Sequence, residues 1–344
     1  MTASSPFGPT DELAELHAHL GGSVPPHALW EIAHLQGIAL PTKDYWEFVD
    51  LTSIADPRGV DGLAGLDQIY HLNELIQSSP LAVERSVAGM IGGGYRSQRI
   101  TTCEVRFNPM KRNRGGERDL DHTILAAIHG LDLAELAYPQ VHARLIVMMD
   151  RTFSAEQNTI IVEKAIRYAS RGVVGIDIAG PRPAPGRFDY RALQPQVELA
   201  REAGLGVTIH VGEEGYVDEI GEVVEHLRPE RIGHGILAAD DPELVRLLRD
   251  TGTVLEICPT SNLLTGALGG EEDVVRVFRT FLEGGVAITV STDGPEMMRT
   301  HLRDEFDFLC RIGALTPDEA RTVNATAHAV RFGAPGRPAR RRGT

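Results

Sequence analysis

Short runs of β-branched and apolar residues alternate with longer amphipathic stretches along most of the 344 residues. This alternation predicts a parallel sheet whose strands are joined by helical crossovers. For a chain of this length, the α/β arrangement that satisfies the pattern is a closed (β/α)8 TIM barrel. Strands are predicted at Glu12–Leu20, Thr101–Phe107, Ala143–Met149, Val173–Ile178, Val207–Val211, Arg231–Gly233, Val254–Ile257 and Ala287–Val290, and helices at Leu81–Gly94, Thr159–Ser170, Arg191–Ala203 and Pro242–Asp250.

The alternative is a doubly wound open sheet, which typically carries a Gly-x-Gly-x-x-Gly turn after an early strand. The chain has no such turn, and its cluster Gly92–Gly94 follows a helical pattern. The segment from Gly22 to about Leu81 contains helical patterns and aromatic residues, which predicts a helical insertion after strand 1, packed over the barrel mouth. No linker is evident, so residues 1–333 are expected to form a single barrel, and the arginine-rich residues 334–344 a disordered tail.

The charge and the cysteine content indicate which partners are disfavoured and in which compartment the protein is expected. The chain has 34 basic and 48 acidic residues, a net charge of −14, which disfavours binding to nucleic acids or anionic membranes. Three scattered cysteines indicate a reducing compartment. No apolar run is long enough to span a bilayer, and the N-terminus lacks a signal-peptide pattern. We therefore expect a cytoplasmic protein, and the sequence leaves its oligomeric state open.

Potential metal ligands gather at the ends of the predicted strands. His17 and His19 are two apart on one strand, so their side chains share a face. His210 ends another strand, and Asp293 follows the last one. Each alone is commonly a polar residue satisfied at a strand terminus, but the carboxyl ends of parallel barrel strands meet at one face. Three imidazoles and a carboxylate suit zinc or a similar divalent ion.

Two further residues fit proton transfer beside such a metal. A bound divalent ion lowers the pKa of its water from about 15.7 towards about 7. Glu213 lies three positions after His210, where it is either a ligand or, more suitably, a proton donor. His234 is flanked by glycines and could hold or deprotonate the water.

An ordered set of motifs resembles the adenosine deaminase family of metal-dependent hydrolases, from about Glu12 to Phe332. The resemblance implies one Zn²⁺ per chain, held by His17, His19, His210 and Asp293. It also implies that Glu213 protonates N1 of the purine as hydroxide attacks C6, while His234 and Asp293 orient the hydroxide. Substrate-binding positions fall on His19, Gly21, Gly180 and Gly294, with the Gly180 amide facing N3. The motifs are Leu16–Leu20, Glu104–Phe107, Gly175–Gly180, His210–Glu213, Arg231–Gly235, Glu256–Pro259 and Ser291–Asp293.

Two positions depart from the family pattern. Gly21 stands where the family usually has Asp or Asn facing the ribose 5′-hydroxyl, and Gly294 where it has an Asp bonded to N7. Loss of a buried polar partner changes substrate discrimination strongly. Glycine is also expected to open space, which would suit an enlarged 5′ substituent, as in aminodeoxyfutalosine. Arg182 would either meet an acidic substituent or be a solvated loop charge, and Glu214 or Glu296 could restore lost contacts.

The sequence therefore predicts zinc-dependent hydrolytic removal of the 6-amino group of an adenine-type nucleoside, a small-molecule substrate, with release of ammonia. One alternative is a metal hydrolase of the same superfamily acting on another amino-heterocycle. The other is a non-catalytic binding protein on this fold.

Overall fold

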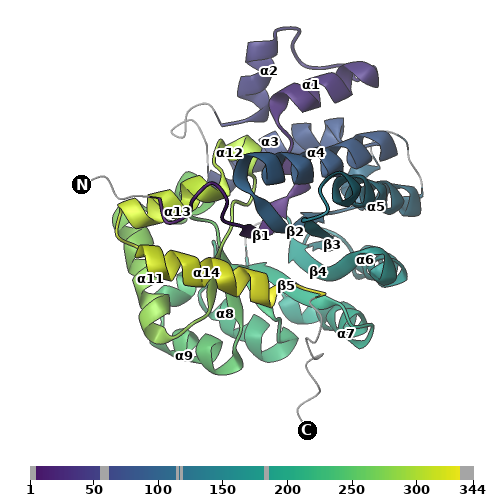
Figure 1. Cartoon of the computed structure of the whole chain (residues 1–344). Helices are drawn as coiled ribbons and strands as arrows, with labels where there is room; N and C mark the ends of the chain where they lie inside the picture. The colour runs from purple at the N-terminus through teal and green to yellow at the C-terminus, as the bar shows by residue number, and fades with distance from the viewer. Residues whose placement is uncertain (1–4, 55–61, 114–115, 117–118, 182–185, 334–344) are drawn as a thin grey trace.

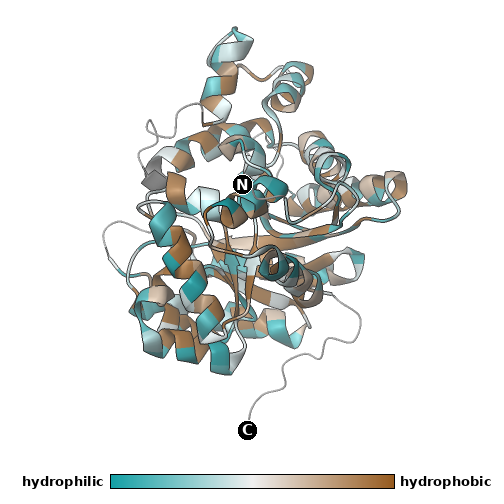
Figure 2. Ribbon diagram, turned by 60° about the vertical axis from the view of Figure 1, so that its left-hand side comes forward, coloured by the Kyte–Doolittle hydropathy of each residue, from teal (hydrophilic) through white to brown (hydrophobic). Residues whose placement is uncertain are grey.

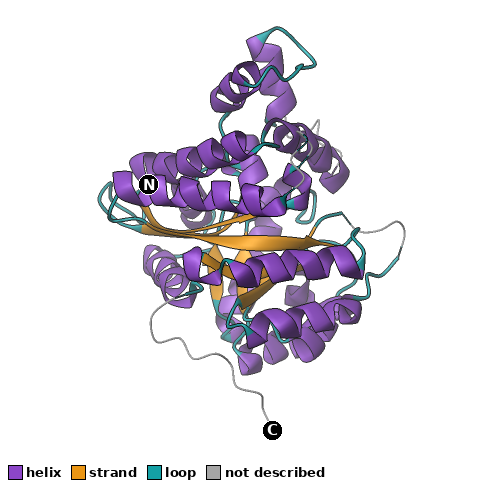
Figure 3. Ribbon diagram, turned by 90° about the vertical axis from the view of Figure 1, so that its right-hand side faces the viewer, coloured by secondary structure: helices purple, strands orange, loops and turns teal. Residues whose placement is uncertain are grey.

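Eight parallel strands form the centre of the computed structural model, which describes residues 5–54, 62–113, 116, 119–181 and 186–333. The strands follow one another around the sheet in chain order. Helices lie around them (Figure 3). Each lies within two residues of its predicted bounds, because buried apolar runs mark strands that helices cover. The strands are β1 Leu13–His19, β2 Ile100–Phe107, β3 His142–Asp150, β4 Val173–Ala179, β5 Gly206–Val211, β6 Arg231–His234, β7 Val254–Ile257 and β8 Ile288–Val290.

Backbone hydrogen bonds join the first strand to the segment after the last. The His19 N–H donates to the Asp293 carbonyl at 2.7 Å, and the Asp293 N–H donates to the His17 carbonyl at 2.8 Å. Ala18 and Asp293 form the corresponding parallel bridge. The (β/α)8 barrel predicted from the sequence is therefore confirmed, and its closure brings two candidate ligands on β1 beside a third after β8.

An outer layer of helices buries its apolar faces against the strands, while polar faces point outward (Figure 2). Local signals fix their ends; for example, Ser154 and Gln157 form a capping box at the start of α6. The predicted Leu81–Gly94 helix continues through the glycine cluster as part of α4. These helices are α4 Pro80–Gln98, α5 Leu120–Ala137, α6 Ala155–Arg167, α7 Gln194–Glu202, α8 Asp218–Glu222, α9 Pro242–Thr251, α10 Pro259–Leu264, α11 Glu271–Gly284, α12 Pro295–Met298, α13 Leu302–Arg311 and α14 Pro317–Val330.

The predicted insertion after β1 is helical. It comprises α1 Pro26–Leu35, α2 Tyr45–Thr52 and α3 Gly62–Ile76, and α1 and α2 project beyond the barrel (Figure 1). The Ile54 N–H donates to the Met297 carbonyl at 2.8 Å, and a small apolar cluster contains Ile54, Leu66, Met297 and Met298. The insertion is thus anchored to the segment that follows β8, next to Asp293. Among the described helices, none has the length and apolar character needed to cross a membrane.

Candidate metal and catalytic site

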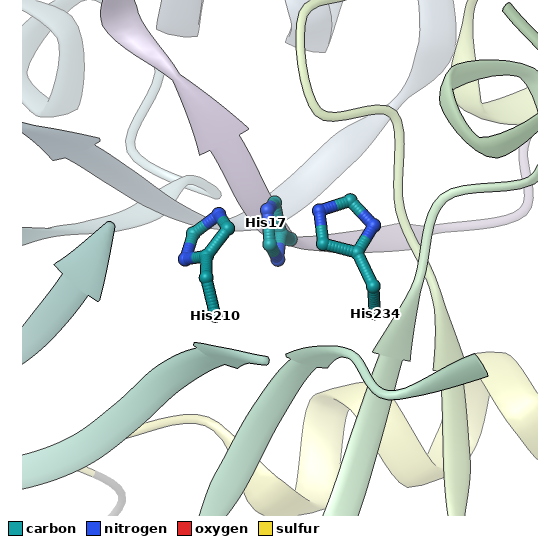
Figure 4. Close-up of side chains that lie close together, drawn as sticks. All are labelled: His17, His210 and His234. Atoms are coloured by element: carbon teal, nitrogen blue, oxygen red, sulfur yellow. The ribbon is translucent and has the colours of Figure 1, made fainter. Parts of the chain in front are cut away.

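Four imidazoles meet at the carboxyl ends of three strands. His17 lies at the centre, with ring centroids 5.3 Å from His19, 4.5 Å from His210 and 4.9 Å from His234. Figure 4 shows His17, His210 and His234 converging from β1, β5 and β6. The structure thus brings together, at one barrel face, all four histidines that the sequence motifs singled out.

Asp293 completes the cluster from the segment after β8. Its Oδ1 lies 3.3 Å from Nε2 of His19 and 3.9 Å from Nε2 of His17. Nε2 of His19 also lies 3.0 Å from Nε2 of His210. Two overlapping groups therefore have metal-binding geometry: His17, His210 and His234, and His17, His19 and Asp293.

The donor set fits a borderline divalent cation. The buried Nε2 of His17 has no hydrogen-bond partner among the described residues, although buried polar atoms are normally satisfied. Burial lowers the pKa of His19 to about 3 and that of His17 well below its usual value. Both imidazoles are therefore neutral at physiological pH, which is the form that binds a metal.

Two buried carboxylates orient the imidazoles of His17 and His210 through their Nδ1 atoms. Oε2 of Glu256 lies 2.8 Å from Nδ1 of His17, and Asp177 lies 3.0 Å from Nδ1 of His210. Arg106 donates to Glu256 at 2.7 Å and to Asp177 at 3.0 Å. Burial opposes ionisation of Asp177, but its interactions with His210 and Arg106 outweigh the effect of burial and keep the pKa of Asp177 low. Such carboxylate–histidine pairs fix the tautomer and direct Nε2 towards a metal.

Glu213 lies beside the cluster and belongs to neither of the two groups with metal-binding geometry. Its Oε2 is 3.5 Å from Nε2 of His234, while Oε1 accepts from Asn262 at 3.4 Å and Thr265 at 3.3 Å. Asn262 also lies 3.0 Å from Nδ1 of His234. This arrangement leaves a carboxyl group close to the metal-binding atoms and available for proton transfer.

The backbone is strained at two residues of the cluster of candidate ligands and proton-transfer groups. His234 and Asp293 have φ values of 63° and 64°, in the left-handed region that non-glycine residues rarely adopt. Such conformations cost about 1–3 kcal/mol and persist where the surrounding structure imposes them, often at functional sites. Both side chains lie beside His17. Ser261 holds the second oxygen of Asp293, donating to Oδ2 at 2.6 Å.

Gly180 follows β4 at the rim of the site, with φ of 90°. A Cβ there would lie 2.3 Å from Oδ2 of Asp150, so the position requires glycine. Asp150 is itself paired with Lys111 at 2.6 Å. Arg182, which the sequence leaves either as a contact for an acidic substituent or as a solvated loop charge, lies outside the described residues.

The expectation that Gly21 and Gly294 open space is wrong, because Tyr70 on α3 occupies it. A Cβ on Gly21 would lie 3.0 Å from Cδ1 of Tyr70, and one on Gly294 would lie 2.8 Å from its hydroxyl oxygen. That hydroxyl lies 3.4 Å from Oδ1 of Asp293. Glu74 and Arg112 also surround Gly21, with atoms 3.2 and 3.4 Å from the same Cβ position.

The two acidic residues suggested as substitutes lie in different surroundings. Glu214 is exposed, and Glu296 lines a separate pocket of about 340 Å³ between α2 and the segment after β8. Burial raises the pKa of Glu296 despite the nearby His301 and His27.

The comparisons with known proteins agree with the geometry. The adenosine deaminase family profile matches residues 12–335. An adenosine deaminase from Clostridium botulinum is 29% identical over 324 residues, covering 93% of both chains. The adenine deaminase from Arthrobacter aurescens has the same fold, with a TM-score of 0.83, 22% identity and 94% coverage of each chain. The N6-mAMP deaminase of Arabidopsis gives a TM-score of 0.80 at 23% identity, also with 94% coverage of each. The chain is an aminohydrolase and belongs to the adenosine deaminase family.

Proposed function

We propose that this enzyme removes the 6-amino group of an adenine-type nucleoside by zinc-dependent hydrolysis and releases ammonia. Membership of the family supports hydrolytic deamination of an adenine-type substrate. The observation that carries the finer proposal is the unsatisfied Nε2 of buried His17, at the meeting point of three more imidazoles and Asp293. Neutral nitrogen donors with one carboxylate are the ligands that zinc prefers.

The proposed ligands are His17, His19, His210 and Asp293. A solved amidohydrolase of the same fold holds zinc, which supports this metal. Zinc, when bound, would lower the pKa of water enough to supply a nucleophile at neutral pH. The protein would contribute the dry, shaped cavity and the Glu256 and Asp177 carboxylates that orient two of the imidazoles.

The proposed proton transfers use Glu213 and His234. Glu213 would donate a proton to ring nitrogen N1 as water adds at C6, and its contacts with Asn262 and Thr265 position it for this step. His234 would orient the water and accept its proton, with Asn262 holding Nδ1. His234 would then pass that proton to the amino group, which leaves C6 as ammonia. The added hydroxyl would lose its proton to Glu213, so that its oxygen stays on the base and Glu213 is protonated again.

The proposed substrate is adenosine or an adenine nucleoside with a modified 5′ group, such as aminodeoxyfutalosine. Solved structures of an Arabidopsis protein of this fold hold IMP or GMP, which supports a purine-like ligand. Near Gly21, the charged groups are Arg112 and Glu74, 3.6 Å apart, instead of the single acidic or amide side chain usual in the family. We therefore expect a modified 5′ group to be contacted by charged side chains that differ from the one usual in the family.

Elemental analysis of the purified protein, with activity measured before and after chelation, tests the metal. We expect close to one equivalent of zinc, loss of activity on chelation and recovery when zinc is restored. Activity that survives removal of all metal would overturn the proposed mechanism.

A further inference from the structure

We propose that Tyr70, delivered by the inserted helix α3, determines specificity: its ring closes the site over Gly21 and Gly294, and its hydroxyl contacts the bound ligand. This inference rests on the proposed function, because it names the residue that reads the adenine-type ligand. Nothing in the sequence motifs marks Tyr70.

The first support is the packing around Tyr70. Cβ atoms added to three glycines would meet it: 3.0 Å from Cδ1 at Gly21, 3.0 Å from the hydroxyl at Gly22 and 2.8 Å from the hydroxyl at Gly294. Any side chain at these positions would displace the phenol. The glycines and Tyr70 therefore form one complementary unit at the seam between β1 and the segment after β8.

The second support is the position of the hydroxyl relative to the metal ligands. It lies 3.4 Å from Oδ1 of Asp293, and the ring centroid of Tyr70 is 5.9 Å from that of His19. At 3.4 Å, the bond to Asp293 is long for O–H···O geometry. A ligand seated at the metal ligands would meet this hydroxyl, which can donate to a ring nitrogen or accept from a hydroxyl of the ligand.

The third support is that the insertion holds Tyr70 in place. Tyr70 packs on the cluster of Ile54, Leu66, Met297 and Met298, which joins the insertion to the segment after β8. The hydroxyl is therefore fixed by packing against the barrel, as a specificity contact requires.

Binding measurements can test the contact without turnover. In a Glu213→Gln background, calorimetry would compare adenosine with 7-deazaadenosine and 5′-deoxyadenosine, each of which lacks one hydrogen-bonding group. We expect the Glu213→Gln variant to bind one of the two analogues at least about 5-fold more weakly than adenosine. Adding Tyr70→Phe should remove most of that difference while zinc content is kept. The assignment would be overturned if an analogue lost the same affinity, relative to adenosine, with and without the Tyr70 hydroxyl. It would also be overturned if neither analogue bound more weakly than adenosine to the Glu213→Gln variant.

A double-mutant cycle tests the packing. Gly294→Ala should lower kcat/KM strongly alone and far less with Tyr70→Phe, because the next atoms, Cα of Gly22 and Cε of Met297, are 3.3 and 3.4 Å away. The matched control is Gly22→Ala, whose Cβ would lie 2.7 Å from Cα of Gly294. The loss of kcat/KM caused by Gly22→Ala should persist in the Tyr70→Phe background. Additive losses for Tyr70 and Gly294 would contradict the proposal.

The two assays separate this proposal from the proposed function. Ammonia release by the wild type with unchanged analogue discrimination in Tyr70→Phe would overturn only the role of Tyr70. Neither binding nor ammonia release with any adenine-type compound would overturn the proposed function, and the role of Tyr70 with it.

Discussion

Nδ1 of His17 lies 2.8 Å from Oε2 of Glu256, and both side chains are fully buried. The same oxygen accepts from Arg106 at 2.7 Å, and the other carboxylate oxygen lies 2.6 Å from Nε of Arg231. One carboxylate therefore links a metal-directed imidazole to two buried guanidinium groups.

Glu256→Gln should weaken zinc binding by about 10- to 100-fold, because the carboxylate fixes the tautomer of His17. Competition with a chromogenic chelator would measure the zinc affinity. Glu104→Gln is the matched control, because Glu104 pairs with Arg231 and, within the part of the chain that the structure describes, has no hydrogen bond or ion pair to a histidine. Both variants should lower the free energy of unfolding, since each weakens a buried ion pair. If both lower zinc affinity equally, Glu256 acts through stability alone.

Glu213→Gln should lower kcat by about 10²-fold or more, the usual scale of lost acid–base catalysis. Zinc content should stay near that of the wild type, because Glu213 lies outside both groups with metal-binding geometry. Steady-state kinetics and elemental analysis on the same preparation would check this. Loss of the metal together with activity would show that Glu213 is a ligand.

Glu305 on α13 should make the protein less stable as the pH rises. Burial raises the pKa of Glu305 to about 7, although Thr260 and Thr300 donate hydrogen bonds to it. Between its ordinary value of 4.5 and about 7, the unfolded carboxyl ionises while the folded one stays protonated. The stabilisation contributed by Glu305 is thus fully present below about pH 4.5. It is lost as the pH rises to about 7, which lowers the free energy of unfolding by at most about 3 kcal/mol.

Glu305→Gln mimics the protonated carboxyl and should remove this loss. Denaturant unfolding of metal-free protein at about pH 4 and about pH 8 would compare the variant with the wild type. Glu15, whose pKa burial also raises to about 7, is present in both proteins, so the difference between them reports the removal of Glu305. The same pH dependence in both proteins would contradict the assignment.

The sequence was sufficient to predict the barrel and the cluster of candidate ligands. Buried parallel strands are continuous apolar runs, and their carboxyl ends must meet, so His17, His210 and Asp293 could be placed together before any coordinates. Asp177 and Glu256 lie within the family motifs, but the sequence alone assigns no role to either. Each acts across the barrel on a histidine of another strand, and that pairing depends on strand register.

Tyr70 could not have been predicted by the same reasoning. It lies on a helix of the insertion, far in sequence from Gly21 and Gly294, and one tyrosine in a helical pattern carries no signal. Its position depends on how α3 packs against the segment after β8. The sequence therefore showed that two side chains were missing but not what replaces them.

Plain adenosine should not be the best substrate. Neither Gly21 nor Gly294 can supply a hydrogen bond from a side chain, and the single hydroxyl of Tyr70 cannot replace both missing side chains. At least one partner for adenosine is therefore lost, which costs about 1–3 kcal/mol. A 5′-modified or otherwise altered adenine compound should exceed adenosine in kcat/KM by at least about tenfold. Adenosine proving best across a panel that includes adenine, AMP and 5′-modified nucleosides would contradict this expectation.

Ammonia release by the purified, zinc-loaded protein from that panel tests the central claim most directly. We expect at least one adenine-type compound to be deaminated with a kcat/KM of about 10⁴ M⁻¹s⁻¹ or more, and the Glu213→Gln variant to lose that activity. No ammonia from any of these compounds, with zinc bound and the protein folded, would contradict the account and favour a binding protein on this fold.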